Sequence, residues 1–276
     1  MLPEERRFRI KEILSDQRSV SAAVLVQTLE ATSATIRRDL ADLEREGVLV
    51  RSHGGAVSRM ASTNFQPNYD ALQRANRAEK VAIAAAAEKL LIEGDTVFLE
   101  GSTTNLELAR RLGSFSRLTV ATNSPPILSL LQRFPSISVV CTGGDLYREQ
   151  FYLSGLLAQH ALSGMRVDKA VFGLTAIDFT YGHSCAKQEE AQVKKMLVKC
   201  GKQRIGLADH TKFGKEAFLF VGPVTDFTTI ITDSGTDPKQ IAGLREAGVE
   251  VIVVEVAKEI PKPSPRAEMS DAHIRF

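Results

Sequence analysis

Residues 21–57 are the stretch that most restricts how this chain can fold. Two short helical patterns are joined there by a tight turn, and an alternating run with paired glycines follows them. In the second pattern Ile36, Leu40 and Leu43 recur at helical spacing, so they share one inward face. Gly47 stands where a helix ends in a left-handed residue. Helix, turn, helix and hairpin in this order predict a winged helix-turn-helix unit.

The start of this second helix, the reading helix, carries the side chains that such a unit turns toward DNA. Thr32 or Ser33 can cap it, because their hydroxyls accept a free backbone N–H. In helix-turn-helix proteins this end reaches base edges in the major groove, where arginine pairs with guanine or holds a phosphate. The hairpin can reach backbone phosphates or the minor groove. We expect contacts to double-stranded operator DNA from Ser33, Thr35, Arg37, Arg38, Arg51 and His53.

The charges of this unit leave a second interpretation open. Basic and acidic residues nearly balance from Met1 to Ala61, and charged helix faces are usually only solvated. The acids fall largely on a first predicted helix, Leu2–Asp16, and on the back half of the reading helix. Arg37 and Arg38 at its front are then either DNA contacts or solvated surface.

After a polar stretch around Pro67, β-branched runs alternate with helical patterns. Strands are expected at Thr96–Leu99, Leu118–Thr122, Ser138–Thr142, Ala170–Leu174, Arg204–Ala208, Thr228–Thr232 and Glu250–Val254. Helices are expected at Glu79–Leu91, Asn105–Leu112, Pro126–Arg133, Glu189–Cys200 and Pro238–Ala247. This alternation predicts an α/β domain with a mostly parallel sheet. The predicted organisation is a DNA-binding unit over 1–57, a linker over 58–75, an α/β domain over 76–256 and a flexible tail over 257–276.

Polar, glycine-containing loops follow several of these strands, and ligands of open α/β sheets bind where strands end. In Gly101–Thr104, glycine, hydroxyls and a helix start suit a phosphate, although Ser and Thr there are also ordinary helix caps. Lysines can add positive charge and a glutamate can accept from sugar hydroxyls, although such residues are commonly solvated. The candidate ligand residues are Glu100, Gly101, Ser102, Thr103, Thr104, Thr122, Asn123, Gly143, Gly144, Glu190, Lys194, Asp209 and Lys212.

The order and spacing of these residues resemble the DeoR family of bacterial transcriptional regulators, over about residues 5–256. The N-terminal match is Thr35-Ile36-Arg37-Arg38-Asp39-Leu40, then Leu43-Glu44, Gly47 and His53-Gly54-Gly55-Ala56. The C-terminal match includes Glu100-Gly101-Ser102-Thr103-Thr104, Thr122-Asn123, Thr142-Gly143-Gly144, Glu190 with Lys194, and Asp209-His210-Thr211-Lys212-Phe213-Gly214.

The resemblance implies a C-terminal domain related in fold to ribose-phosphate isomerases, and a regulator that in most members represses sugar-catabolism genes. A phosphorylated sugar or related metabolite would modulate its hold on operator DNA. A helix-turn-helix usually reads paired half-sites, which favours a homodimer or homotetramer. Many members carry Asp where this chain has Glu100, so the longer side chain can change the ligand geometry near that loop.

An alternative function is a sugar-phosphate isomerase-like enzyme with an accessory DNA-binding domain. Its acid–base groups would come from Glu100, Glu190, Asp209 and His210, but the chain lacks the Asp-Gly-Ala-Asp-Glu run of ribose-5-phosphate isomerases. We expect no catalysis. No Gly-x-Gly-x-x-Gly follows a predicted strand, so no nicotinamide cofactor is expected either.

Further classes are disfavoured by what the sequence lacks. The histidines and cysteines have no paired metal spacing. No run reaches the ~20 apolar residues of a membrane helix, and the N-terminus has no signal-peptide core. We expect a cytoplasmic protein without bound metal, in which Cys141, Cys185 and Cys200 are reduced.

Overall fold

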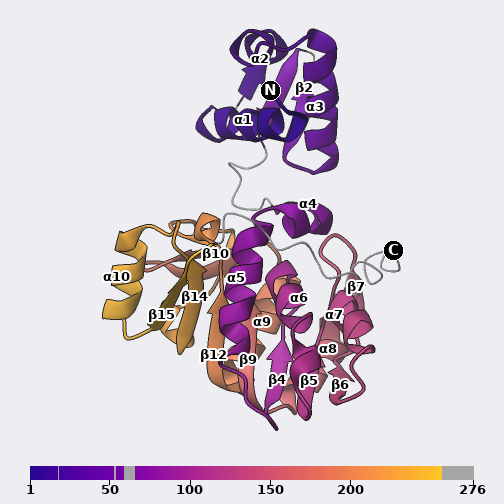
Figure 1. The fold of residues 1–276 in the computed structure, drawn as a ribbon, viewed down its shortest axis with the longest axis vertical. Coiled ribbons are helices and arrows are strands. Elements are labelled where there is room, and N and C mark those ends of the chain that lie inside the picture. The colour runs from indigo at the N-terminus through magenta and orange to yellow at the C-terminus, as the bar shows by residue number, and fades with distance from the viewer. Residues whose placement is uncertain (18, 53, 59–65, 257–276) are drawn as a thin grey trace. The chain divides into compact units, whose positions relative to one another are not determined.

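The computed structural model describes residues 1–17, 19–52, 54–58 and 66–256. The chain divides into two compact units, Met1–Arg74 and Ala75–Phe276, which Figure 1 colours along the chain. The predicted tail, residues 257–276, and residues 59–65 of the predicted linker lie outside the described residues. The described end of the predicted linker contains a short helix, α4, Tyr69–Arg74.

The first unit is a winged helix-turn-helix, as the sequence predicts. In chain order it contains α1, Pro3–Asp16; β1, Ser19–Ser21; α2, Ala22–Thr28; α3, Ser33–Arg45; β2, Leu49–Ser52; and β3, Gly55–Ser58. The strands pair antiparallel in the order β1-β3-β2. The sequence pattern does not predict strand β1, because three residues are too few to show a periodic alternation.

The reading helix α3 packs by its predicted inward face. Ile36, Leu40 and Leu43 are buried in a core that α1, α2 and the strands share. Arg6 of α1 adds an ion pair with Asp39 of α3, in which Nε and Oδ2 are 2.5 Å apart and both side chains are buried. An apolar core and a buried charge pair together hold α1 against α3.

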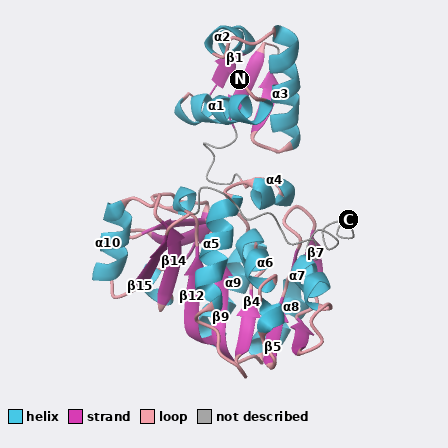
Figure 2. Cartoon of the chain, viewed as in Figure 1, coloured by secondary structure: helices cyan, strands magenta, loops and turns pink. Residues whose placement is uncertain are grey.

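A seven-stranded parallel sheet forms the centre of the second unit (Figure 2). The strands lie in the order β15-β14-β12-β9-β4-β5-β6 and pair in parallel. Each overlaps a run that the sequence predicts as a strand, which confirms the α/β class. Their bounds are Thr96–Leu99 for β4, Leu118–Thr122 for β5, Ile137–Cys141 for β6, Val167–Gly173 for β9, Gly201–Leu207 for β12, Thr229–Asp233 for β14 and Glu250–Val254 for β15.

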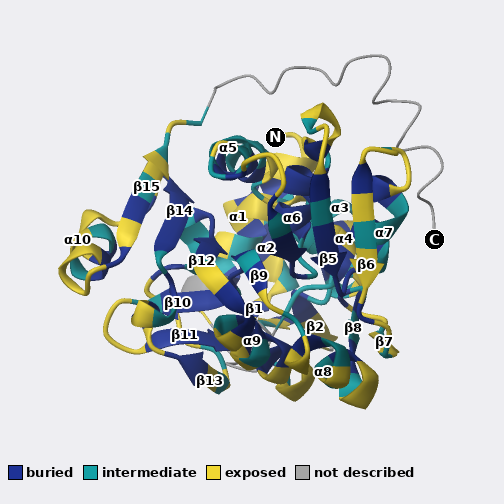
Figure 3. Cartoon of the chain, turned by 90° about the horizontal axis from the view of Figure 1, so that it is seen from below, coloured by how far each residue is buried: buried dark blue, intermediate teal, exposed yellow. Residues whose placement is uncertain are grey.

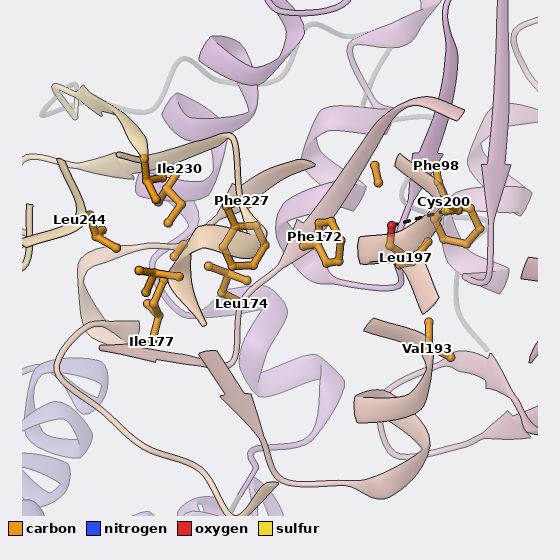
Figure 4. Packing of buried hydrophobic residues seen from close by; sticks show 14 of the residues in the cluster. Phe98, Phe172, Leu174, Ile177, Val193, Leu197, Cys200, Phe227, Ile230 and Leu244 are labelled. Carbon is orange, nitrogen blue, oxygen red and sulfur yellow. Dashed lines mark hydrogen bonds between the residues drawn. The ribbon is translucent and has the colours of Figure 1, made fainter. Parts of the chain in front are cut away.

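Helices cover both faces of this sheet, with α5 and α6 on one face and α9 on the other (Figure 3). Phe98 on β4, Phe172 on β9 and Leu197 on α9 are buried in the core cluster that Figure 4 shows. The helix bounds are Arg77–Glu88 for α5, Thr103–Ala109 for α6, Pro125–Leu131 for α7, Gly155–Ser163 for α8, Gln188–Cys200 for α9 and Pro238–Glu246 for α10. The sequence pattern predicts all of these except α8. None of the described helices is long and apolar enough to cross a membrane.

Two small antiparallel sheets, which the sequence pattern does not predict, accompany the parallel sheet. Strands β7, Asp145–Tyr147, and β8, Tyr152–Ser154, form one hairpin. Strands β10, Ala176–Asp178; β11, Gly182–Cys185; and β13, Leu219–Gly222, form the other sheet. Strands of three or four residues give too weak an alternation to be recognised. Short 3-10 turns lie at Leu112–Ser114 (η1), His210–Lys212 (η2) and Val224–Asp226 (η3).

Candidate functional site

Two exposed arginines make the front of the reading helix α3 basic. Thr32 caps the helix, and its hydroxyl accepts a hydrogen bond from Thr35 N at 3.2 Å. Ser33, Arg37 and Arg38 are exposed. Within the described part of the chain, neither arginine forms an ion pair. Both guanidinium groups are available to an external anion.

The acidic residues of α3 are paired inside the unit instead. Asp39 pairs with Arg6, and Asp42 pairs with Arg7 at 3.0 Å, both arginines belonging to α1. A further pair joins α1 to the residue that follows α3. Because Asp39 and Asp42 are neutralised by α1, these two acids do not cancel the positive charge at the front of α3.

The wing matches its prediction less well. Arg51 Nε lies 2.6 Å from Glu44 Oε2, and Arg51 N also donates to Glu44 Oε1 at 3.0 Å. A DNA phosphate would have to compete with that carboxylate. His53 lies outside the described residues. The front of α3 is the stronger part of the candidate DNA interface.

In the second unit, hydrogen bonds draw together the loops that follow β4 and β5. Asn123 Oδ1 accepts from Gly101 N at 2.8 Å, and the buried Thr122 hydroxyl donates to Leu99 O at 2.7 Å. A Cβ on Gly101 would lie 2.8 Å from Tyr152 Cβ, so Tyr152 packs on this loop. Its buried hydroxyl has no hydrogen-bond partner among the described residues. Tyr152 is thus a polar neighbour of the loop that the sequence analysis misses.

The predicted phosphate loop begins with a helix cap. Ser102 Oγ accepts from Asn105 N at 3.1 Å, which is the capping interpretation of this serine. Thr103 and Thr104 are buried in the first turn of α6. A Cβ on Gly173, at the end of β9, would lie 2.2 Å from Ser102 Cβ. The hydroxyls of this loop are therefore packed closely, and they do not project freely into solvent.

The glycines after β6 shape a turn. Gly143 and Gly144 have φ values of 66° and 115°, which an L side chain rarely adopts. A Cβ on Gly144 would lie 2.2 Å from Ser154 O, whereas the Cβ position of Gly143 is open. The lack of a side chain at Gly144 therefore lets the turn pack against β8, whereas the backbone at Gly143 is accessible.

Glu100 and Lys194 form a buried ion pair at the centre of the site. Lys194 Nζ is 2.5 Å from Glu100 Oε1 and also donates to Gly173 O at 2.5 Å. Glu100 Oε2 accepts from Gly173 N at 2.8 Å. Glu190 Oε1 lies 3.4 Å from Lys194 Nζ and accepts from the Thr175 hydroxyl at 2.7 Å. For Glu190 and Lys194 the interpretation as solvated surface groups is wrong, because both side chains are buried.

The environment of this pair shifts the pKa of both groups. Burial raises the pKa of Glu100 to about 7, against the attraction of Lys194. Burial also opposes the charge on Lys194, but attraction to Glu100 and Glu190 outweighs it and raises the Lys194 pKa. Glu100 and Lys194 therefore hold each other as charge partners in a site that is shielded from solvent.

A third cluster surrounds the end of β12. Asp209 is buried and caps the η2 turn, where its Oδ1 accepts from Thr211 N at 3.1 Å. Lys80 of α5 is buried, and its Nζ donates to Ala75 O at 2.6 Å. Burial lowers the pKa of Lys80 to about 8. Burial opposes the charge on Asp209, but attraction to Lys212 and Lys80 and the Thr211 hydrogen bonds outweigh it and lower the Asp209 pKa.

Lys80 is absent from the sequence-based candidates, although helical periodicity can reveal it. It shares a buried face of α5 with Ile83, Ala84 and Ala87, at the spacing of one helical stripe. A lysine on such a face requires polar partners. Asn76, whose amide bonds to Asp209 at 2.9 Å, gives no such signal, because the two residues are far apart in sequence.

The described residues offer little for metal or thiol chemistry. They contain no group of three or more His, Cys, Asp or Glu side chains that could hold a metal ion. Cys141 is exposed, and Cys185 and Cys200 are buried, all as free thiols. Burial raises the pKa of Cys185 to about 12, so this thiol is unreactive at neutral pH.

Both units match known proteins. Residues 6–61 match the DeoR-like helix-turn-helix domain, and residues 75–234 match the DeoR C terminal sensor domain. The chain is 35% identical over 258 residues to YulB, an uncharacterized HTH-type transcriptional regulator of Bacillus subtilis, with 94% of this chain and 99% of that protein covered. It is 35% identical over 236 residues to the transcriptional repressor AccR of Agrobacterium fabrum, with 84% and 90% covered.

Likeness to solved structures is weaker. Ribose 5-phosphate isomerase A of Methanocaldococcus jannaschii has a TM-score of 0.37 at 18% identity, with 50% of this chain and 55% of that chain covered. The two domain matches and the near full-length similarity to regulators decide the assignment. The chain belongs to the DeoR family of DNA-binding transcriptional regulators.

Proposed function

We propose that this chain is a cytoplasmic repressor of carbohydrate-catabolism genes whose hold on operator DNA is modulated by a phosphorylated sugar or related metabolite. The observation that carries the proposal is that one chain combines an uncancelled basic front on α3 with buried charged groups at the carboxyl edge of the sensor-domain sheet. The names of relatives support it, since AccR is called a transcriptional repressor and an Escherichia coli O157:H7 relative a putative aga operon transcriptional repressor.

On the DNA side, Ser33, Thr35, Arg37 and Arg38 contact the operator in the major groove. Two such helices are needed to read a repeated operator, so the active form is a homodimer or homotetramer. Arg51 contacts a phosphate only if it leaves Glu44. We therefore expect it to contribute less to operator binding than the α3 residues do.

Replacement of Arg37 and Arg38 by alanine tests the DNA interface. The probe is duplex DNA from the region upstream of the chain's own gene, measured by fluorescence anisotropy against a scrambled duplex. Each lost contact costs about 1–3 kcal/mol, so we expect the loss of two to lower operator affinity about 30-fold or more. Arg9→Ala is the matched control, because Arg9 is exposed on α1 and its one ion pair among the described residues is with Glu12. Unchanged affinity in the double variant would reject the assignment.

On the effector side, the anionic group of the ligand contacts the loop Gly101–Thr104 and the lysines near the end of β12. Glu190, the pair of Glu100 with Lys194, and the Tyr152 hydroxyl face the sugar. Asp209 and Lys212 complete the set, and Lys80 adds a cation to the residues expected from sequence. Thr122, Asn123 and Gly144 position the loops, while Gly143 offers accessible backbone. The gathering of these groups at neighbouring strand ends supports a polar, negatively charged ligand.

A thermal-shift panel of phosphorylated sugars and their unphosphorylated partners tests the effector class. A ligand at 100 times its Kd stabilises the native state by about 2.7 kcal/mol. We expect shifts from phosphorylated members only. Lys212→Ala should reduce the shift, whereas Lys239→Ala, on the exposed start of α10, should retain it. Equal shifts from free sugars, or none from any phosphosugar, would reject the sugar-phosphate assignment.

A further inference from the structure

Asn76 stands where the chain enters the sensor domain, after α4 and directly before α5. Its φ is 49°, a left-handed conformation that asparagine tolerates better than most residues with a Cβ. Its amide nitrogen donates to Asp209 Oδ1 at 2.9 Å and to Thr211 Oγ1 at 3.2 Å. These two bonds tie the entry of the chain to the end of β12.

Asp209 Oδ1 is shared between the entry point and the η2 turn. The same oxygen accepts from Asn76, from the Thr211 backbone N–H and from the Thr211 hydroxyl. The neighbouring Lys80 and Lys212 compensate the charge of this buried carboxylate. An anion bound to these lysines would place negative charge beside Asp209, whose Oδ1 is the acceptor for Asn76.

On the N-terminal side of Asn76, helix α4 and the residues before it belong to the first unit. Asn68 Oδ1 accepts from Ala71 N at 2.9 Å, close to the start of α4. Asn68 Nδ2 donates to the carbonyl of Arg45, the last residue of α3, at 3.1 Å. The six-residue helix α4 is therefore held at its start to α3, and Asn76 follows two residues after its end.

We propose that Asn76 is a positioning residue that couples occupancy of the effector site to helix α4. When an anion engages Lys80 and Lys212, the hydrogen bond from Asn76 to Asp209 weakens and α4 loosens at its C-terminal end. The coupling rests on the proposed function, because it needs an anionic effector at the end of β12. An effector shifts a conformational equilibrium only by its differential affinity for the two states, and this bond is made in one of them.

Amide hydrogen exchange of the full chain tests the coupling, with inorganic phosphate as the probe and sodium chloride at matched ionic strength as its control. In the parent chain, phosphate should slow exchange in residues 208–214 and quicken exchange in α4 by about threefold or more. In Asn76→Gly, which keeps the left-handed conformation and loses the amide, residues 208–214 should still respond and α4 should not. Ala75→Gly adds the same backbone freedom one residue earlier and should behave like the parent.

Asn76→Asp supplies a test that needs no ligand. It removes the donor and sets a carboxylate against Asp209, so α4 should exchange as fast without phosphate as the parent does with it. An α4 response to phosphate that survives in Asn76→Gly, or an unchanged α4 in Asn76→Asp, would overturn the coupling. If phosphate leaves residues 208–214 of the parent unaffected while Asn76→Asp loosens α4, the proposed anion site at the end of β12 is rejected. The role of Asn76 in holding α4 is then supported separately.

Discussion

The ion pair between Arg6 and Asp39 makes the stability of the DNA-binding unit depend on one arginine of α1. Arg6 Nε and Nη2 donate to the two carboxylate oxygens at 2.5 and 3.2 Å, and Asp39 is only 3% exposed. Arg6→Ala leaves this carboxylate buried without its cation, a change that costs about 3–5 kcal/mol. We expect about 3 kcal/mol, the lower end of this range, because the Arg6 side chain retains 11% exposure to water.

That cost is large beside the stability available. At about 0.05–0.15 kcal/mol per residue, a unit of this size is stable by roughly 4–11 kcal/mol. Amide exchange in α3 of the full chain measures the loss directly, and about 3 kcal/mol corresponds to about 150-fold faster exchange. Arg9→Ala, which breaks the exposed pair with Glu12, should change exchange by no more than about threefold.

A second variant separates the charge from the packing. Arg6→Met with Asp39→Leu replaces the pair by apolar side chains of similar size, and such replacements are often neutral or stabilising. The double variant should therefore recover most of the protection that Arg6→Ala loses. If Arg6→Ala exchanges like the parent chain, or if the double variant is as labile as Arg6→Ala, the buried carboxylate is not the source of the effect.

Three further outcomes follow from the sensor domain. Because the pKa of Glu100 is raised from 4.5 to about 7, the stability that its protonation adds is full below about 4.5 and lost as pH rises through 7; Glu100→Gln should remove this part of the pH dependence in urea unfolding. Gly173→Ala places a methyl group onto Ser102, so we expect destabilisation of about 1–3 kcal/mol in the same assay. Alkylation at neutral pH should modify the exposed Cys141 rapidly and leave the buried Cys185 unmodified; equal labelling in mass spectra would contradict its burial.

The sequence predicts the architecture well where a signal is local and repeated. The seven parallel strands and the stripe of Ile36, Leu40 and Leu43 are such signals, because β-branched runs and helical spacing recur over several residues. The partners of single charged residues are not local. Nothing near Glu100 indicates that it meets Lys194 at 2.5 Å, because the fold brings α9 against β4 and β9. Buried helical stripes are the exception: Lys80 on α5 and Lys194 on α9 each lie on one, which is a local sign that the lysine needs a partner.

The nearness of the proposed effector site to the end of the linker follows from the topology of the sheet. Helix α5 precedes β4 and packs on the sheet, so it runs back along the sheet and its first turn lies where the strands end. That edge is also where ligands of open parallel sheets bind. The bond from Asn76 to Asp209, at the end of β12, is the direct sign of this placement. A sensor domain that begins with such a helix therefore receives its linker at the edge where we propose that the effector binds, which places Asn76 within hydrogen-bonding distance of Asp209.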